Sequence, residues 1–268
     1  IYTNYMHGQL DVIPICFLFM AAYFLYKNAF RISAILLGIG CACKLHLLLV
    51  LPLFFMVLPK SKFFISRNVI YFILFSVSFI LGNTLFFSPE YIQMVYQNAE
   101  QSKLLDITFY FFSNVKFYII PGIVFLLYIR FYFLKAKGRD VLCAFLVLSY
   151  SSLLFFIPPM QGWYYWIIPF LIITSIHNQL KTKAIIISFS ISYFLYFLFS
   201  PQSDYFTIFQ FINPSISAYD PLISSIAAVS QNIAKIIQHA SYTLLQTVLL
   251  ATSIWIYYVI SHNIALNK

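Results

Sequence analysis

The run ISAILLGIGCACKLHLLLVLPLFFMVL occupies residues 32–58, and two polar residues, Lys44 and His46, interrupt it near its middle. The run is long for one transmembrane helix, which needs about 20 apolar residues. Basic residues stand close to both of its ends, and cytoplasmic loops collect Lys and Arg. A single crossing would put these two basic groups on opposite sides of a membrane. We therefore predict two short antiparallel helices, about 32–43 and 47–58, with Lys44-Leu45-His46 at the turn.

The composition of the whole chain indicates a membrane protein. Of the 268 residues, 62% are hydrophobic, 21% are aromatic and 9% are charged, whereas soluble domains are about 45–50% apolar and about 25% charged. So few charges cannot cover a globular surface, which excludes an ordinary soluble enzyme or a nucleic-acid-binding protein. The expected fold is all-α, a polytopic helical bundle that forms one transmembrane domain over residues 1–268.

Apolar runs divide the chain into about nine membrane segments, several of them short or broken. They fall at 10–26, 32–43, 47–58, 68–87, 107–129, 141–157, 164–179, 184–200 and 242–261. With this count, successive loops lie on alternate sides of the membrane. The basic residues then fall on the cytoplasmic side with four exceptions, Lys44, Lys103, Lys116 and Lys235. The net charge of +9 is then explained by topology and does not call for an anionic partner such as nucleic acid.

The outer side receives residues 1–11, the turn at 44–46, and the segments 88–106, 158–163 and 201–241. In the last of these, apolar residues recur at helical spacing opposite a polar face, at Leu222, Ile226, Val229, Ile233 and Ile236. This pattern suits either a helix in the membrane interface or one packed on the outer ends of the spans. The chain begins at Ile1 without a signal-peptide pattern, and we expect it to be an N-terminally truncated fragment.

Lys44 and His46 are the strongest candidates for a binding site. Ionisable groups inside a membrane are costly and usually mark a pathway or a site. At the outer tip of two short helices, an ammonium and an imidazole would face a partly dehydrated space, where pairing with a phosphate or pyrophosphate is strong. A snorkelling lysine beside a hydrogen-bonded histidine is the structural alternative.

A second candidate group is His7-Gly8-Gln9-Leu10-Asp11, immediately before the first apolar helix. An imidazole, an amide and a carboxylate at alternate positions can bind sugar hydroxyls, and His7 or Asp11 could transfer protons. Helix capping is the alternative for Asp11, because Pro14 lies in the first turn after it.

A third candidate is the aromatic segment PPMQGWYYWIIPF, residues 158–170. Aromatic residues at a membrane interface normally anchor the protein, but Gln161, Trp163 and Tyr164 are also typical of a surface that binds carbohydrate. The sequence has no Gly-rich phosphate loop, no Ser-His-Asp pattern and no Cys/His metal spacing. We therefore predict no metal-ligating residues.

The order of these motifs resembles the central region of the GT-C glycosyltransferases that use polyprenyl-phosphate sugars. His7-Gly8-Gln9-Leu10-Asp11, followed by an apolar helix, a basic turn and Lys44-Leu45-His46, is similar to motifs of two groups. They are the bacterial polyprenol-phosphate-mannose mannosyltransferases and the dolichyl-phosphate-sugar enzymes. The segment from Gln161 to Phe170 is similar to a Q-x-x-Y-x-W-x-x-P segment of GPI and N-glycan mannosyltransferases. The resemblance covers residues 5–60 and 158–172.

The resemblance implies an inverting hexosyltransferase of GT-C type. It would move a hexose from a polyprenyl-phosphate donor to a glycan or glycolipid acceptor on the outer face, and mannose is the first candidate for this hexose. No nucleotide is implied, and the need for a divalent metal stays open. The family's principal catalytic acid lies in an outer loop that would precede Ile1.

The resemblance also assigns roles to the candidate residues. Lys44 and His46 would bind the donor phosphate and stabilise its growing negative charge. Gln9 would position sugar hydroxyls together with His7 and Asp11, which are the candidate catalytic residues within the chain. The sugar site would be lined by Gln161, Trp163 and Tyr164.

Two other classes fit a membrane protein with buried basic groups and outer aromatic residues. One is a flippase or transporter for lipid-linked sugars, and the other is a polysaccharide polymerase of the O-antigen type. Segment 201–241 contains no Arg, which speaks against the polymerase. The expected location is the cell membrane, plasma or inner, with the active face outside. The membrane of the endoplasmic reticulum is the alternative.

Overall fold

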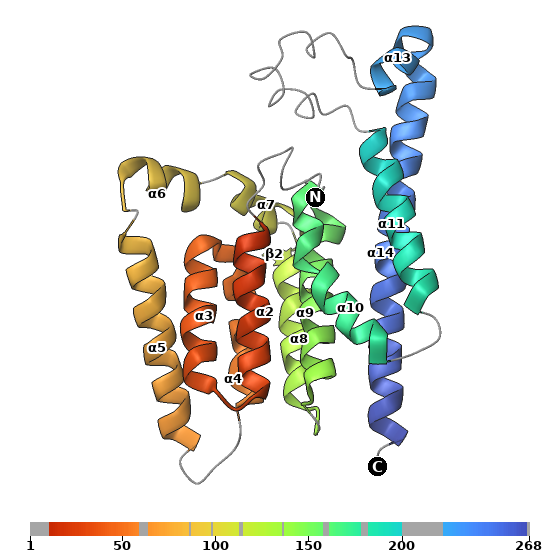
Figure 1. Ribbon diagram of the computed structural model, residues 1–268. Helices are drawn as coiled ribbons and strands as arrows, with labels where there is room; N and C mark the ends of the chain where they lie inside the picture. Colours follow the sequence, from red (N-terminus) through yellow and green to blue (C-terminus); the bar gives the residue numbers. More distant parts are fainter. Residues whose placement is uncertain are drawn as a thin grey trace.

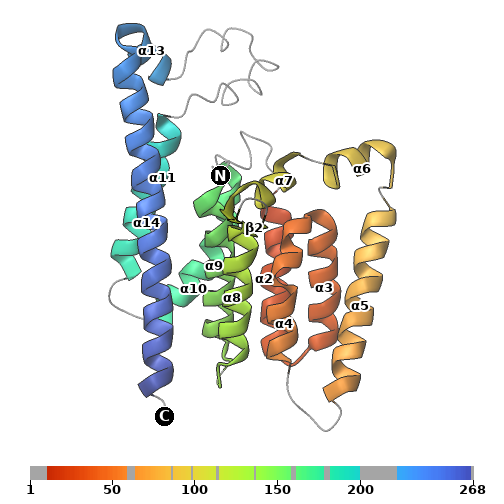
Figure 2. The same ribbon diagram turned by 180° about the vertical axis from the view of Figure 1, so that it is seen from behind.

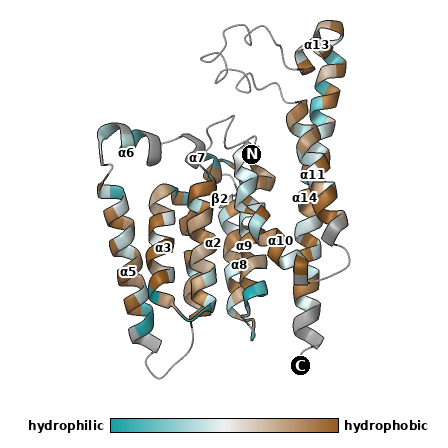
Figure 3. Ribbon diagram, in the orientation of Figure 1, coloured by the Kyte–Doolittle hydropathy of each residue, from teal (hydrophilic) through white to brown (hydrophobic). Residues whose placement is uncertain are grey.

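The protein is a bundle of helices that stand side by side along one direction (Figures 1 and 2). The computed structural model describes residues 11–58, 64–85, 87–97, 99–112, 115–135, 137–157, 161–177, 182–199 and 222–266. We call the end of the bundle where the described chain starts, at Asp11, the loop end, and the opposite end the basic end. Hydrophobic residues cover most of the helix lengths, and hydrophilic residues gather near helix ends (Figure 3).

Three helices of the described chain are long and apolar enough to cross a membrane, at Arg67–Thr84, Arg139–Phe156 and Gln231–Ser261. Several further apolar helices are shorter. This length and composition indicate a protein associated with a membrane.

The predicted division of residues 32–58 is confirmed. Helix α2 (Val12–Tyr26) runs from the loop end to the basic end, and α3 (Phe30–Cys43) runs back (Figure 1). Lys44 then adopts an extended backbone, with φ −152° and ψ 118°. After it, the 3₁₀ helix η1 (Leu45–Val50) leads into α4 (Leu51–Val57), which returns toward the basic end. Pro52, in the first turn of α4, has no N–H to leave unsatisfied there.

Small residues let α3 pack closely on α5 (Phe64–Thr84). Gly38 and Ala42 stand one helical turn apart on α3, and Ser78 and Gly82 do so on α5. A Cβ at Gly38 would lie 2.6 Å from the carbonyl oxygen of Phe75, and one at Gly82 would lie 2.6 Å from the Ala42 Cβ. This arrangement is the small-xxx-small contact by which helix backbones approach each other in membranes.

Two short helices cover the loop end after α5. They are α6 (Pro89–Val95) and α7 (Ala99–Asp106). The side-chain oxygen of Asn83, near the end of α5, accepts hydrogen bonds from the hydroxyls of Tyr91 and Tyr96. These bonds tie α6 to α5.

The prediction of one helix over residues 107–129 is wrong in its first half. Strands β1 (Thr108–Phe111) and β2 (Val115–Tyr118) form an antiparallel hairpin, and only α8 (Ile119–Tyr132) is helical. The described chain is therefore mostly helical but not all-α. Aromatic and β-branched residues dominate both strands, and such residues favour strands over helices.

Helix α9 (Arg139–Phe156) lies at the centre of the second half, and its residues from Leu142 to Leu154 are all buried. It packs against α8, α10 (Ile168–His177) and α14 (Gln231–Leu266). The 3₁₀ helix η3 (Gln161–Trp166) connects α9 to α10 at the loop end, and α11 (Thr182–Leu198) packs on α14.

The segment 201–241 is helical in its second part. Residues 200–221 lie outside the described chain, α13 covers Leu222–Val229, and residues 231–241 form the start of α14. The apolar residues of the predicted helix thus belong to two helices, which meet at Ser230. Whether they lie in a membrane interface stays a prediction.

Candidate functional site

Asp11 and Lys44, from two separate sequence motifs, form an ion pair at the loop end. Asp11 immediately precedes α2 and Lys44 follows α3, so the antiparallel packing of these helices brings the two residues together. The Lys44 Nζ atom contacts Asp11 Oδ1. The Asp11 side chain is 2% exposed and that of Lys44 is 38% exposed. Asp11 occupies the N-cap position of α2, but its side chain makes no capping hydrogen bond, so its partner is the lysine.

A group of packed aromatic rings lies beside the lysine. The His46 imidazole stacks on Trp166, with ring centroids 3.8 Å apart and 24° between the ring planes. Trp163 stacks on Trp166 at 5.1 Å. The Tyr150 ring stands edge-on to His46 at 5.9 Å and to Trp166 at 6.0 Å. The Lys44 Nζ atom lies 5.9 Å from the centroid of Trp166, within the range of a cation–π interaction.

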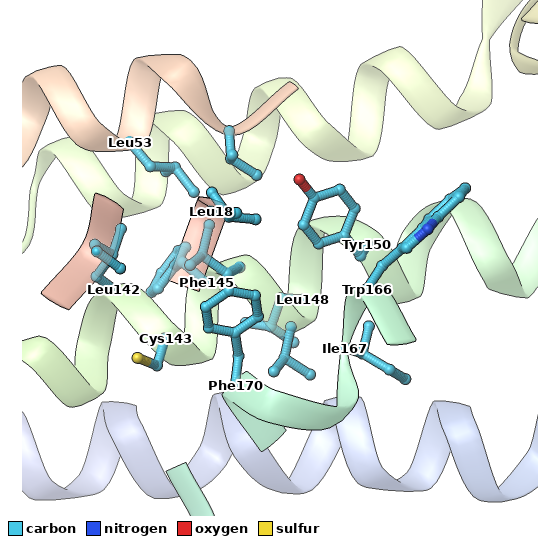
Figure 4. Close-up of a cluster of buried hydrophobic side chains, with 14 of the residues drawn as sticks. Leu18, Leu53, Leu142, Cys143, Phe145, Leu148, Tyr150, Trp166, Ile167 and Phe170 are labelled. Atoms are coloured by element: carbon cyan, nitrogen blue, oxygen red, sulfur yellow. The ribbon is translucent and has the colours of Figure 1, made fainter. Parts of the chain in front are cut away.

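We call Asp11, Lys44, His46, Tyr150, Trp163 and Trp166 the Lys44 cluster. They come from the start of α2, the α3–η1 junction, α9 and η3. Figure 4 shows Tyr150 and Trp166 at one margin of the buried hydrophobic residues, with the Tyr150 hydroxyl on the side away from Phe170. Tyr150 and Trp166 are both buried, so the cluster adjoins the apolar core.

Besides Asp11 Oδ1, whose partner is the Lys44 ammonium, three buried polar atoms of this cluster have no hydrogen-bond partner within the described chain. They are His46 Nε2, the Tyr150 hydroxyl and Trp166 Nε1. A buried polar group without a partner costs about 1–3 kcal/mol, and few such groups occur in native proteins. Three of them on three elements, beside an ion pair, indicate a place that accepts a polar ligand or ordered water. The structural alternative for this pair required a hydrogen-bonded histidine. Within the described chain, His46 Nε2 has no hydrogen-bond partner.

The chemistry available in the cluster is that of binding an oxyanion and a sugar. The ammonium of Lys44 and the indole N–H of Trp166 donate hydrogen bonds, while the imidazole and the phenol can donate or accept them. The Trp163 and Trp166 rings provide apolar faces. Among the residues that the structure describes, no three His, Cys, Asp or Glu side chains come together to hold a metal ion.

The other predicted residues have different placements. Tyr164 is fully buried, and within the described chain its ring contacts Phe189, Tyr193 and Phe197 of α11, at 5.4, 5.3 and 6.2 Å. These contacts lead to α11, so the structure does not bring Tyr164 to Lys44.

Two of the remaining candidates, His7 and Gln9, lie outside the described residues. Gln161 begins η3, but only its backbone is described. Their predicted roles stay predictions.

Sequence reasoning missed Tyr150 and Trp166. Trp166 belongs to the aromatic segment that was singled out, but it was not selected from it. Tyr150 stands in the middle of an apolar run, where the sequence Ser149-Tyr150-Ser151-Ser152 places four hydroxyls in succession. All four residues are buried. That polar interruption of an apolar helix is the signal that could have identified Tyr150.

A scan against protein-family models finds no match to this chain, and searches of curated proteins and of solved structures find none either. The functional interpretation therefore rests on the residues, their geometry and the resemblance of their motifs.

Proposed function

We propose that the chain belongs to a membrane glycosyltransferase of GT-C type. It would move a hexose, with mannose as the first candidate, from a polyprenyl-phosphate donor to a lipid-linked or glycan acceptor. The observation that carries this proposal is the Lys44 cluster, in which a cation and buried polar atoms without protein partners lie beside stacked indole rings. A phosphate ester of a sugar offers a matching set of groups, because its oxyanion accepts hydrogen bonds and its ring packs on aromatic faces.

In this mechanism Lys44 binds the donor phosphate. As the bond between the sugar and the phosphate breaks, negative charge grows on the phosphate, and a fixed ammonium stabilises it. His46 and Tyr150 supply further hydrogen bonds to the same group. The Lys44 side chain is partly exposed, and its ammonium has two donors besides the one that contacts Asp11, since an ammonium has three.

The role we propose for Asp11 is to position Lys44. Its carboxylate is buried and already engaged by the ammonium, so an acceptor hydroxyl would have to displace the lysine to reach it. Within the chain, the proton acceptor is then His7. The resemblance implies inversion at the anomeric carbon.

The proposed arrangement in the membrane follows the alternation of helix directions. We propose nine membrane segments, formed by α2, α3, η1 with α4, α5, α8, α9, α10, α11 and α14. Helix α10, at about 1.5 Å per residue, is a short segment that η3 extends. The basic end would face the cytoplasm and the loop end the outside of a cell membrane, or the lumen of the endoplasmic reticulum.

The test uses the protein in lipid nanodiscs, with a radiolabelled polyprenyl-phosphate mannose and the acceptor glycolipid. Lys44→Gln is expected to lower kcat/KM by about 10²-fold, the typical effect of removing one charge-stabilising group. The matched control is Lys235→Gln, which removes an exposed lysine in the first turns of α14 and should leave transfer unchanged. Transfer at the parent rate by Lys44→Gln would show that the lysine is not in the donor site.

A carrier for lipid-linked sugars is the second candidate, because oppositely charged residues that pair at the ends of membrane helices also occur along transport pathways. The Asp11–Lys44 pair is the observation in its favour. The same purified protein in sealed vesicles separates the two functions. A carrier moves a labelled lipid-linked sugar across the bilayer without forming a new glycosidic bond, whereas a transferase forms the bond on one side.

A further inference from the structure

The β1–β2 hairpin has one apolar face and one cationic, partly polar face. Its register pairs Thr108 with Tyr118, Phe109 with Phe117, Tyr110 with Lys116 and Phe111 with Val115. Successive side chains of a strand point to opposite faces, and directly paired residues share a face. One face therefore carries four apolar residues, Phe109, Phe111, Val115 and Phe117. The other carries Thr108, Tyr110, Lys116 and Tyr118.

The apolar face is exposed within the described chain. Phe109, Phe111, Val115 and Phe117 are 56%, 49%, 63% and 49% exposed. The rings of Phe109 and Phe111 lie 4.9 Å apart, and Phe111 lies 6.5 Å from Phe117, so these residues form one continuous surface. Phe112, directly after β1, is 93% exposed. On the opposite face the Lys116 ammonium lies 5.6 Å from the Tyr110 ring centroid. A contiguous apolar surface of this kind marks an interaction site.

One residue of the apolar face, Phe117, packs on the start of α8. A Cβ at Gly122 would lie 2.6 Å from the Phe117 Cζ atom, so the Phe117 ring packs against the backbone of the first turn of α8. The backbone N–H of Ile119 donates a hydrogen bond to the carbonyl of Ile107 at 3.1 Å, which closes the base of the hairpin. The Phe117 end of the apolar face therefore adjoins α8, and Lys116 stands on the opposite face of the hairpin.

That apolar face joins an exposed apolar stripe on α8. Phe125, Leu126 and Ile129 follow Gly122 at helical spacings of three, four and seven residues, which places them on the side of the helix that Phe117 contacts. They are 63%, 63% and 40% exposed. A helix side of this composition in a membrane protein faces lipid chains.

We propose that the β1–β2 hairpin lies in the membrane interface at the loop end. Its apolar face would contact the upper part of the acyl chains, and Lys116 would reach the headgroup phosphates. The unpaired outer edges of a two-stranded hairpin cannot enter the hydrocarbon core, because their N–H and C=O groups need water. The boundary between headgroups and acyl chains offers apolar contacts to one face, phosphates to the other, and water to the backbone groups of both edges. Aromatic residues are enriched there. This inference rests on the membrane location of α8 and not on glycosyl transfer.

The test places a fluorescent coumarin amino acid at one position at a time in the full-length protein, in nanodiscs whose lipids carry bromine on the acyl chains. The positions are Phe111 on the apolar face, Tyr110 on the cationic face and Phe125 on α8. Bromine is expected to quench position 111 at least about twofold more than position 110, because an interfacial element buries its apolar face by about 5–10 Å. Val115 provides a second apolar-face position if the label at Phe111 disturbs the strand.

Strong quenching at position 125 with equal, weak quenching at 110, 111 and 115 would overturn the proposal, since the hairpin would then lie outside the bilayer. Absence of quenching at 125 would overturn it together with the membrane location of α8. Hexose transfer is measured on the same samples. Its absence with the quenching pattern intact would count against the proposed function and leave the hairpin assignment supported.

Discussion

Replacing Lys44 by Met should destabilise the protein by leaving a buried carboxylate without its partner. The substitution removes the ammonium and leaves the Asp11 carboxylate, whose side chain is 2% exposed, without its partner. Breaking a buried ion pair from one side typically costs about 3–5 kcal/mol. The Lys44 side chain is 38% exposed, so water can reach part of the space it leaves, and we expect about 2–4 kcal/mol at pH 7.

The assay is the free energy of unfolding in mixed micelles, followed by circular dichroism, for the parent, Lys44→Met and the double variant Asp11→Asn/Lys44→Met. The double variant removes both charges and should return to within about 1 kcal/mol of the parent. Lys235→Met, the same change at an exposed position, should cost less than about 0.5 kcal/mol. A loss in Lys44→Met no larger than that of Lys235→Met would refute the buried pair.

Three further outcomes test other parts of the structure. Gly38→Val should lower the free energy of unfolding by about 1–3 kcal/mol, because the new side chain forces α3 away from α5. A Cβ at Gly138 would meet nothing within 4 Å, so Gly138→Ala should stay within about 0.5 kcal/mol of the parent. Equal effects of the two substitutions would refute the close approach of α3 and α5. Tyr128→Phe removes a hydrogen bond to a carbonyl of η1 and should cost about 1 kcal/mol of unfolding free energy. In intact cells, an impermeant maleimide should label Leu45→Cys but not Asn28→Cys; the reverse pattern would invert the proposed orientation.

The sequence was most informative where charge and apolar length conflicted. Residues 32–58 could be divided correctly because the basic residues on both sides excluded a single crossing, and Lys44 and His46 marked the place. In 107–129 the loop charges agree with a single crossing, and the polar residues Ser113, Asn114 and Lys116 were passed over within an otherwise apolar run. A short apolar run does not separate strand from helix by periodicity, and the high aromatic content of the whole chain hid the local enrichment.

The site was predicted only in part. The prediction was incomplete because the spacing of the aromatic residues depends on a helix type that the sequence does not reveal. In a 3₁₀ helix, residues three apart lie above each other. In η3 this puts Trp163 in line with Trp166, which explains their stacking at 5.1 Å. Tyr164 is one residue further along and turns toward α11. The aromatic segment was therefore the right region, but Trp166, and not Tyr164, is the residue that meets His46.

The pairing of Lys44 with Asp11 limits how the proposed site can hold an anion. The pair is close to neutral, so attraction by net charge is weak, and a phosphate would be held mainly by oriented donors. The ammonium, the indole N–H, the imidazole and the phenol can supply them, and three of these have buried polar atoms that lack partners within the described chain. In a region of low dielectric such hydrogen bonds are strong, and no uncompensated charge stays buried when the donor leaves. A chain that carries charge on 9% of its residues could in this way bind a phosphate at the membrane edge without a cluster of cations.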